Sequence, residues 1–203
     1  MNQPYVGTTL DVQSFINTQP LSRYQWRVVI LCFLIVFLDG LDTAAMGFIA
    51  PALSQDWGID RASLGPVMSA ALIGMVFGAL GSGPLADRFG RKVVLVSAVL
   101  VFGAFSLASA YSTNVDQLLV LRFLTGLGLG AGMPNATTLL SEYTPERHKS
   151  LLVTSLFSGF NLGMAGGGFI SAKLIPSLGW HSLLLFGGIL PLILAVVLLV
   201  WLP

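Results

Sequence analysis

Residues 83–95 read GPLADRFGRKVVL and lie between two long apolar runs. Residues 62–86 contain no Asp, Glu, Lys or Arg, and residues 93–115 contain none either. About 20 apolar residues in a helix cross the hydrocarbon core of a bilayer, so each run is long enough to span a membrane. The charged turn between the runs is short, so the chain must reverse there. Because Lys and Arg gather in cytoplasmic loops, the three cations of this turn predict a helical hairpin whose turn faces the cytoplasm.

The composition indicates a membrane protein. Only 9% of the residues are charged and 55% are hydrophobic, and the mean hydropathy is +0.84. A soluble domain is about 25% charged. The net charge of +1 argues against a nucleic-acid partner. The sequence contains no CxxC, HExxH or GxxxxGK[ST] motif, so we expect neither an enzyme nor a protein with a metal or other cofactor.

The apolar runs predict six membrane helices, with residues 1–25 as an N-terminal segment. The six ranges are about 26–52, 63–86, 92–111, 117–140, 150–173 and 182–202. With this topology, seven cations fall on one side of the membrane and two on the other. The first group is Arg23, Arg27, Arg88, Arg91, Lys92, Arg147 and Lys149, and the second is Arg61 and Lys173. The imbalance predicts that both termini are cytoplasmic.

Two of the predicted helices resemble each other. Residues 37–42 read FLDGLD in the first helix, and residues 123–128 read FLTGLG in the fourth. A three-plus-three inverted repeat leaves this kind of trace in a sequence. We therefore expect helices 1–3 to superpose on helices 4–6 after rotation about an axis in the membrane plane.

The charged turn resembles the signature loop of the major facilitator superfamily, which joins helices 2 and 3. The resemblance implies an all-α membrane fold of twelve helices in two six-helix halves, with the substrate held between the halves. This chain would be the N-terminal half, a six-helix bundle, and the C-terminal half would be its partner. Whether the chain is a fragment or a natural product stays open.

The resemblance also implies that the turn acts as a latch in alternating access. The residues of this predicted gating loop are Gly83, Asp87, Arg88, Gly90, Arg91 and Lys92, with Glu142 as a partner for Arg88 or Arg91. Gly90 permits the tight reversal. In the superfamily the Asp of the loop meets the second half. Anchoring of the topology by the three cations alone is the alternative.

Two acids, Asp39 and Asp42, lie inside the first predicted helix. Each would cost about 2.5–3.5 kcal/mol at the centre of a membrane helix, which makes an intramembrane acid a functional candidate. Three residues apart, the two share one helix face. Burial and mutual repulsion both favour protonation, which suits proton binding and release. Structural carboxyl groups bonded to backbone or to an Arg are the alternative.

At residues 39–43 the sequence DGLDT resembles the DGxD motif of the aromatic acid:proton symporters, a family within the superfamily. This resemblance extends over nearly the whole chain. It implies import of 4-hydroxybenzoate or protocatechuate across the bacterial inner membrane, driven by the proton gradient. A symporter for another small organic anion, or a non-transporting helical module that senses a ligand or binds a partner, remains open.

Two further polar residues complete the expected site. Arg122 begins RFLTGLGLG, which resembles the superfamily's RxxxGxGxG motif in helix 4. The predicted topology brings it within reach of Asp42, although an Arg that snorkels to the interface is the alternative. Asn161 lies mid-helix in GFNLGMAGGG. This stretch resembles the GxxxGPxxGG motif of proton antiporters, except that Met164 stands in place of the proline. Asn161 would contact substrate or bond a neighbouring helix.

Overall fold

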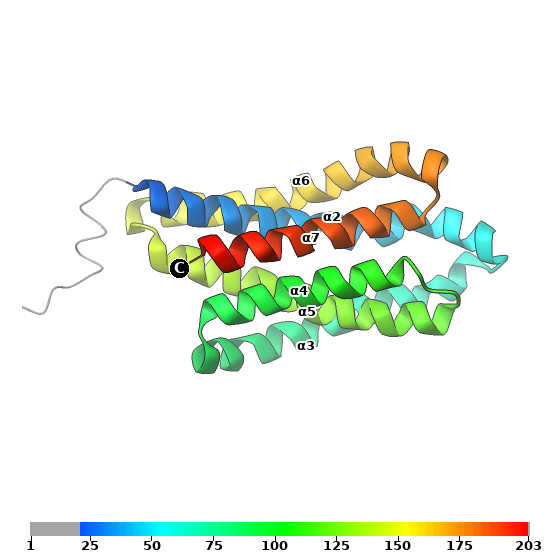
Figure 1. Ribbon diagram of the computed structural model, residues 1–203, viewed down its shortest axis with the longest axis horizontal. Coiled ribbons are helices and arrows are strands. Elements are labelled where there is room, and N and C mark those ends of the chain that lie inside the picture. The colour runs from blue at the N-terminus through cyan, green and yellow to red at the C-terminus, as the bar shows by residue number, and fades with distance from the viewer. Residues whose placement is uncertain (1–20, 203) are drawn as a thin grey trace, which may run out of the picture.

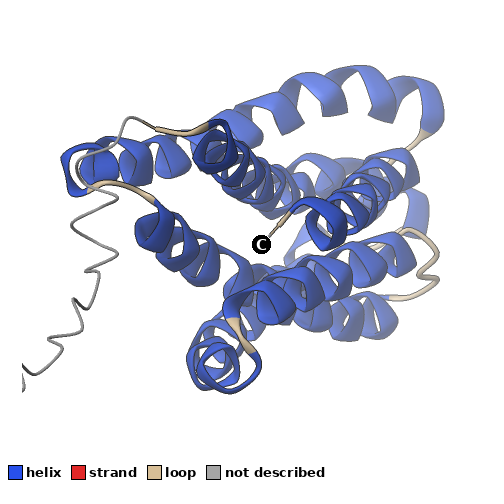
Figure 2. Cartoon of the chain, turned by 60° about the vertical axis from the view of Figure 1, so that its left-hand side comes forward, coloured by secondary structure: helices blue, strands red, loops and turns tan. Residues whose placement is uncertain are grey.

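The computed structural model describes residues 21–202, and these form a bundle of long helices (Figure 1). The elements are α2 (Arg23–Trp57), a short 3-10 turn (Arg61–Leu64), α3 (Gly65–Phe89), α4 (Arg91–Ser109), α5 (Val115–Tyr143), α6 (Glu146–Leu178) and α7 (His181–Trp201). Figure 2 shows the same bundle obliquely, with short loops between the helices. No strand occurs within residues 21–202. The predicted all-helical fold is confirmed.

Most helices are longer than the sequence predicted, and α2 shows why. It begins at Arg23 because Ser22 caps it: Ser22 Oγ accepts from the Gln25 backbone, and the Gln25 side chain accepts from the Ser22 backbone. It continues to Trp57 and ends at Gly58, whose φ of 63° is left-handed. Hydropathy marks only the apolar part of a helix, whereas capping decides where the backbone hydrogen bonds stop. Residues 1–20 of the predicted N-terminal segment lie outside the described residues.

Five of the helices are long and apolar enough to cross a membrane, namely α2, α3 with its preceding turn, α4, α5 and α7. Hydropathy does not identify α6 as a span, because glycine and serine dilute its apolar residues. The helix nevertheless runs alongside α2 (Figure 1). The fifth predicted helix, about 150–173, is therefore part of the bundle, although its composition is not that of a typical span.

Glycines bring α2 and α6 into backbone contact. A Cβ on Gly40 would overlap the carbonyl oxygen of Phe160, and a Cβ on Gly163 would overlap the carbonyl oxygen of Phe37. Each glycine lies three residues beyond the residue whose carbonyl the other helix approaches. No side chain fits between the two helices here, as is typical of close helix pairs in membranes.

The same arrangement recurs between α5 and α3. A Cβ on Gly126 would overlap the Ala71 carbonyl oxygen, and a Cβ on Gly74 would overlap that of Phe123. The helices α2 and α5, which carry the similar sequences, run in opposite directions (Figure 1). This repetition of equivalent contacts is what an inverted repeat predicts.

One end of the bundle gathers the start of α2, the end of α7 and the charged turn. The Arg27 guanidinium lies 5.4 Å from the centre of the Trp201 ring. Lys92 Nζ, of the charged turn, donates to the Leu202 carbonyl oxygen at 2.6 Å. Gln25 Nε2 donates to the Tyr143 carbonyl oxygen at 2.7 Å. Both ends of the described chain therefore lie on the same side of the bundle as the turn.

At the opposite end of the bundle, two tryptophans pack against each other. Trp57, the last residue of α2, meets Trp180 edge to face, with ring centres 5.7 Å apart. Trp180 Nε1 also donates to Asp56 Oδ2 at 3.0 Å. These contacts connect the end of α2 to the loop between α6 and α7.

Candidate functional site

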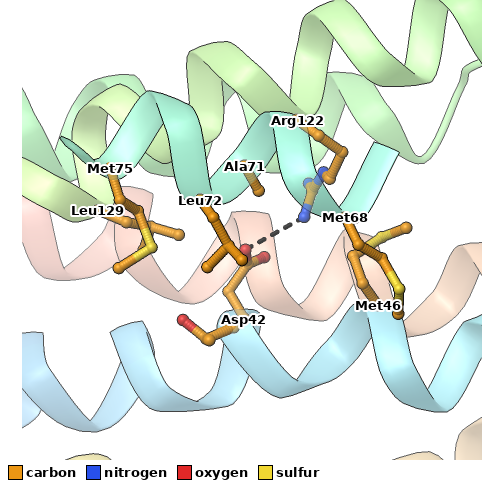
Figure 3. Close-up of a pocket in the computed structure, with 9 residues that line it drawn as sticks. Asp42, Met46, Met68, Ala71, Leu72, Met75, Arg122 and Leu129 are labelled. Carbon is orange, nitrogen blue, oxygen red and sulfur yellow. Dashed lines mark hydrogen bonds and ion pairs between the residues drawn. The ribbon is translucent and has the colours of Figure 1, made fainter. Parts of the chain in front are cut away.

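A buried ion pair joins α2 to α5. Arg122 Nη1 lies 3.1 Å from Asp42 Oδ2, and the two side chains are only 1% and 3% exposed (Figure 3). The predicted pairing of these two residues is therefore present, and Arg122 does not snorkel to an interface. Removing one partner of such a pair would leave a buried charge uncompensated, which typically costs about 3–5 kcal/mol.

Two serines of α4 complete the polar cluster. Ser106 Oγ donates to Asp42 Oδ1 at 2.6 Å, and Arg122 Nε donates to Ser109 Oγ at 3.3 Å. Both serines are fully buried. Sequence reasoning missed them. Their spacing of three residues puts both on one face of an otherwise apolar helix, and this is the signal that could have identified them.

Asp39 lies one turn before Asp42 and is also buried, at 3% exposure. Among the described residues, none forms a hydrogen bond with Asp39 Oδ1. A void of about 10 Å³ borders its side chain, between α2, α4 and α5. The first acid of the motif is thus less saturated by hydrogen bonds than the second, which has an Arg and a Ser as partners.

A larger cavity, of about 120 Å³, opens beside the ion pair between α2, α3 and α5 (Figure 3). Its polar lining consists of Asp42, Thr43 and Arg122. Its apolar lining consists of Met46, Met68, Ala71, Leu72, Met75 and Leu129. Thr43 Oγ1 and Arg122 Nη2 are both buried, and neither makes a hydrogen bond of good geometry within residues 21–202, although Thr43 lies close to the Asp39 carboxyl group. The cavity therefore has one polar end and apolar walls.

Asn161 does not join this cluster. It is exposed on α6, and its Nδ2 donates to the Phe157 carbonyl oxygen of the same helix at 3.0 Å. The contact with substrate expected for Asn161 stays a prediction.

The charged turn forms one of its expected contacts. Arg91 Nε lies 2.6 Å from Glu142 Oε1, at the end of α5. Of the two cations expected to reach Glu142, it is Arg91 that does so, whereas the Arg88 guanidinium lies over the ring of Phe89 at 5.3 Å. Gly90 has a φ of 87°, and this positive φ, which glycine adopts readily, lets α4 begin directly after α3.

Two members of the predicted gating loop have no partner within the described part of the chain. Asp87 is exposed at the end of α3, and no hydrogen bond or ion pair within residues 21–202 involves it. Gly83 faces open space, since a Cβ there would meet nothing within 4 Å. Both positions are therefore accessible to a second body at this end of the bundle.

The sequence model of the Major Facilitator Superfamily matches residues 32–203, which is most of the chain. The chain belongs to this superfamily. A superfamily member with several apolar helices is a multi-pass membrane protein, as the composition predicted.

Relatives within the superfamily are similar over the whole chain. The 4-hydroxybenzoate transporter PcaK of Pseudomonas putida is 88% identical over 100% of the chain, which covers 46% of that protein. PcaK of Acinetobacter baylyi is 68% identical over 97% of the chain and 43% of that protein. A gallate transporter of Pseudomonas putida is 56% identical over 95% of the chain and 43% of that protein. The chain thus spans about half the length of the curated relatives it matches. All three are named as transporters, in agreement with the expectation that the chain is not an enzyme.

Solved transporter structures share the fold. The inward-open xylose transporter XylE from Escherichia coli superposes with a TM-score of 0.75 at 20% identity, over 87% of this chain and 48% of XylE. A bacterial homologue of the human lysosomal transporter Spinster, in an inward-facing conformation, gives 0.76 at 17% identity, over 91% and 44%. The match to about half of each transporter supports the fold predicted for one six-helix half.

Proposed function

We propose that this chain forms the N-terminal half of a proton-coupled symporter that imports an aromatic acid, 4-hydroxybenzoate or protocatechuate. The observation that carries the coupling is the buried Asp42–Arg122 pair, which lies one turn from Asp39 inside the bundle. The substrate class is supported by the names of the relatives, at 88% identity for the 4-hydroxybenzoate transporter of Pseudomonas putida.

The buried pair can link a proton to an anion. When Asp42 is ionised it neutralises Arg122, and the guanidinium has little attraction left for a second carboxylate. When Asp42 gains a proton, the positive charge of Arg122 is uncompensated and favours an anionic substrate. Ser106 serves both states, because its hydroxyl donates to the ionised carboxylate and accepts from the protonated one. Proton and anion are thereby bound together.

The missing partner in this scheme is a second six-helix half. The exposed Asp87 and the Arg91–Glu142 pair would meet it at the end of the bundle that carries the turn. Leu72, Val76 and Leu80 of α3 are 58%, 57% and 71% exposed, which suits apolar surroundings such as lipid or that half. The cations of the turn favour the cytoplasmic side of a bacterial inner membrane, with both termini on the same side.

The proposal is tested by uptake of labelled 4-hydroxybenzoate in cells that lack other carriers and express the full-length transporter containing this half. We expect accumulation that a protonophore abolishes, and no accumulation by Asp42→Asn, whose amide cannot carry the proton. Asp116→Asn, an exposed acid in the first turn of α5, is the matched control. Protonophore-resistant accumulation, or full accumulation by Asp42→Asn, would contradict proton coupling through this pair.

A different aromatic acid is the main competing substrate, because a gallate transporter is 56% identical over most of the chain. Competition against labelled 4-hydroxybenzoate by protocatechuate, gallate and a non-aromatic acid such as succinate ranks these substrates. Stronger inhibition by succinate than by any aromatic acid would favour another organic anion. Binding without uptake would favour a module that senses its ligand.

A further inference from the structure

We propose that the cavity between α2, α3 and α5 is the subsite that holds the carboxylate and the ring of the aromatic acid. Thr43 and Arg122 receive the carboxylate at the polar end. Met46, Met68 and Met75 enclose the ring. This inference rests on the proposed function and adds the location of the substrate and the residues that select it.

The polar end has two buried groups suited to a carboxylate. Arg122 Nη1 and Nε are occupied by Asp42 and Ser109, but Nη2 is buried and has no partner. Thr43 Oγ1, one residue after Asp42, is buried close to the Asp39 carboxyl group and makes no hydrogen bond of good geometry within residues 21–202. A carboxylate accepts from a guanidinium N–H and a hydroxyl at once. An anion in this position would satisfy both groups, and buried polar groups are normally satisfied.

The apolar walls of the cavity are rich in methionine. Three of the six methionines in the chain, Met46, Met68 and Met75, line this cavity (Figure 3). Thioether sulfur makes favourable contacts with aromatic rings, and the flexible Met side chain adapts to their shape. A cavity on the order of 150 Å³ with apolar walls accommodates a benzene ring in another protein. The cavity here, of about 120 Å³ with one polar end, is of the right size class for a benzoate.

The exposure of the lining residues shows which end of the cavity is open. Arg122 and Met46 are 1% and 5% exposed, so they form the closed end. Met68 and Leu72 of α3 are 37% and 58% exposed, so they form the mouth. A carboxylate on Arg122 therefore directs the opposite edge of the ring toward the mouth. This half would recognise the carboxylate and the ring, whereas the para substituent would lie outside the subsite.

The first test removes the hydroxyl of Thr43 in the full-length transporter, with uptake measured per transporter in the membrane. Thr43→Val keeps the shape of the side chain but loses a hydrogen bond to an anion. We expect the KM for 4-hydroxybenzoate to rise about tenfold. Thr43→Ser should restore it. Thr154→Val, at an exposed position of α6, should leave KM unchanged.

The same variant also tests the orientation of the substrate. Benzoate lacks the para hydroxyl but has the carboxylate and the ring. We expect Thr43→Val to weaken inhibition by benzoate by the same factor as it raises the KM for 4-hydroxybenzoate. A loss confined to 4-hydroxybenzoate would mean that Thr43 binds the para hydroxyl and would overturn the orientation. An unchanged KM for Thr43→Val would overturn the role of Thr43.

The second test concerns the methionines. In the double variant Met68→Leu with Met75→Leu, volume and hydrophobicity are nearly kept while both sulfur atoms are lost. We expect the preference for benzoate over cyclohexanecarboxylate, measured as the ratio of their inhibition constants, to fall about fivefold. Met133→Leu, a partly buried position in α5 outside the cavity, is the matched control and should keep the ratio.

The outcomes separate this inference from the proposed function. If the wild-type transporter accumulates no aromatic acid, the proposed function itself fails. If it does, but the Thr43 and methionine variants match their controls, the function stands and the substrate binds elsewhere. Only a rise in KM for Thr43→Val together with a lower aromatic preference for the methionine double variant supports the subsite.

Discussion

At the scale of single residues, the site depends on a serine that sequence motifs do not mark. Within residues 21–202, Ser106 is the one neutral hydrogen-bond donor to Asp42, at 2.6 Å. We expect Ser106→Ala to destabilise the protein by about 1.5–3 kcal/mol, because a buried hydrogen bond to a charged group is lost. Thermal unfolding of the purified full-length transporter measures this. Ser97→Ala, on the same helix but exposed and bonded to its own backbone, should be neutral; equal losses in both variants would contradict the assigned role.

The acids and the arginine could be predicted from the sequence, whereas the serines could not. A charged residue within an apolar run raises the free energy of membrane insertion whichever way its side chain points. Asp39, Asp42 and Arg122 can therefore be identified from the sequence alone. A serine in a membrane helix usually bonds a carbonyl of its own helix, as Ser97 does with Val94. Which serine turns toward a neighbouring helix depends on packing, and hydropathy does not report packing.

At the scale of helices, the close approach of α2 and α6 requires glycine. Gly40→Ala would place a methyl group against the Phe160 carbonyl, with backbone on both sides and no flexible side chain to move away. We expect a loss of about 1–3 kcal/mol in the free energy of unfolding, with a lower yield of folded transporter. Gly47→Ala, on the same helix with nothing within 4 Å of the new Cβ, is the control. If Gly40→Ala and Gly47→Ala have the same melting temperature, the two helices can move apart without loss of stability, and the packing argument is wrong.

The sequence predicted every helix but not how each one is used. All six expected ranges correspond to helices, yet α6 fails the hydropathy criterion for a span. The glycines of α6 allow backbone contact with α2 but lower the mean hydropathy of the helix. The same residues that let α6 pack closely therefore keep it below the hydropathy criterion for a span. The repeat of FLDGLD and FLTGLG was informative because glycine spacing records such contacts directly.

At the scale of the whole molecule, the Arg91–Glu142 pair separates the two interpretations of the charged turn. Its side chains are 29% and 48% exposed, so the pair contributes only about 0–1 kcal/mol to stability. If the turn acts as a latch, Arg91→Glu should reduce uptake more than tenfold while the melting temperature changes little, and Glu142→Arg combined with it should recover part of the uptake. If the turn only anchors topology, uptake should follow the amount of correctly inserted protein.

A second prediction at this scale concerns residues 1–203 expressed without further chain. Transport in the superfamily needs a site between two halves that move against each other. We expect this segment to insert into the membrane but to give no protonophore-sensitive uptake of 4-hydroxybenzoate. Uptake in cells that lack other carriers, with the amount in the membrane measured by an epitope tag, provides the test. Accumulation against the gradient would show that six helices suffice.

The tryptophan contact between α2 and the loop before α7 provides an intrinsic fluorescence signal for one end of the bundle. Trp57 and Trp180 pack edge to face and share Asp56 as a neighbour, so separation of these two segments changes the surroundings of both indole rings. No tryptophan lines the cavity beside Arg122, so emission from this pair is not quenched by direct contact with a ligand there. Fluorescence from a variant that keeps only these two tryptophans would therefore follow the opening and closing of that end of the bundle, independently of occupancy at its centre.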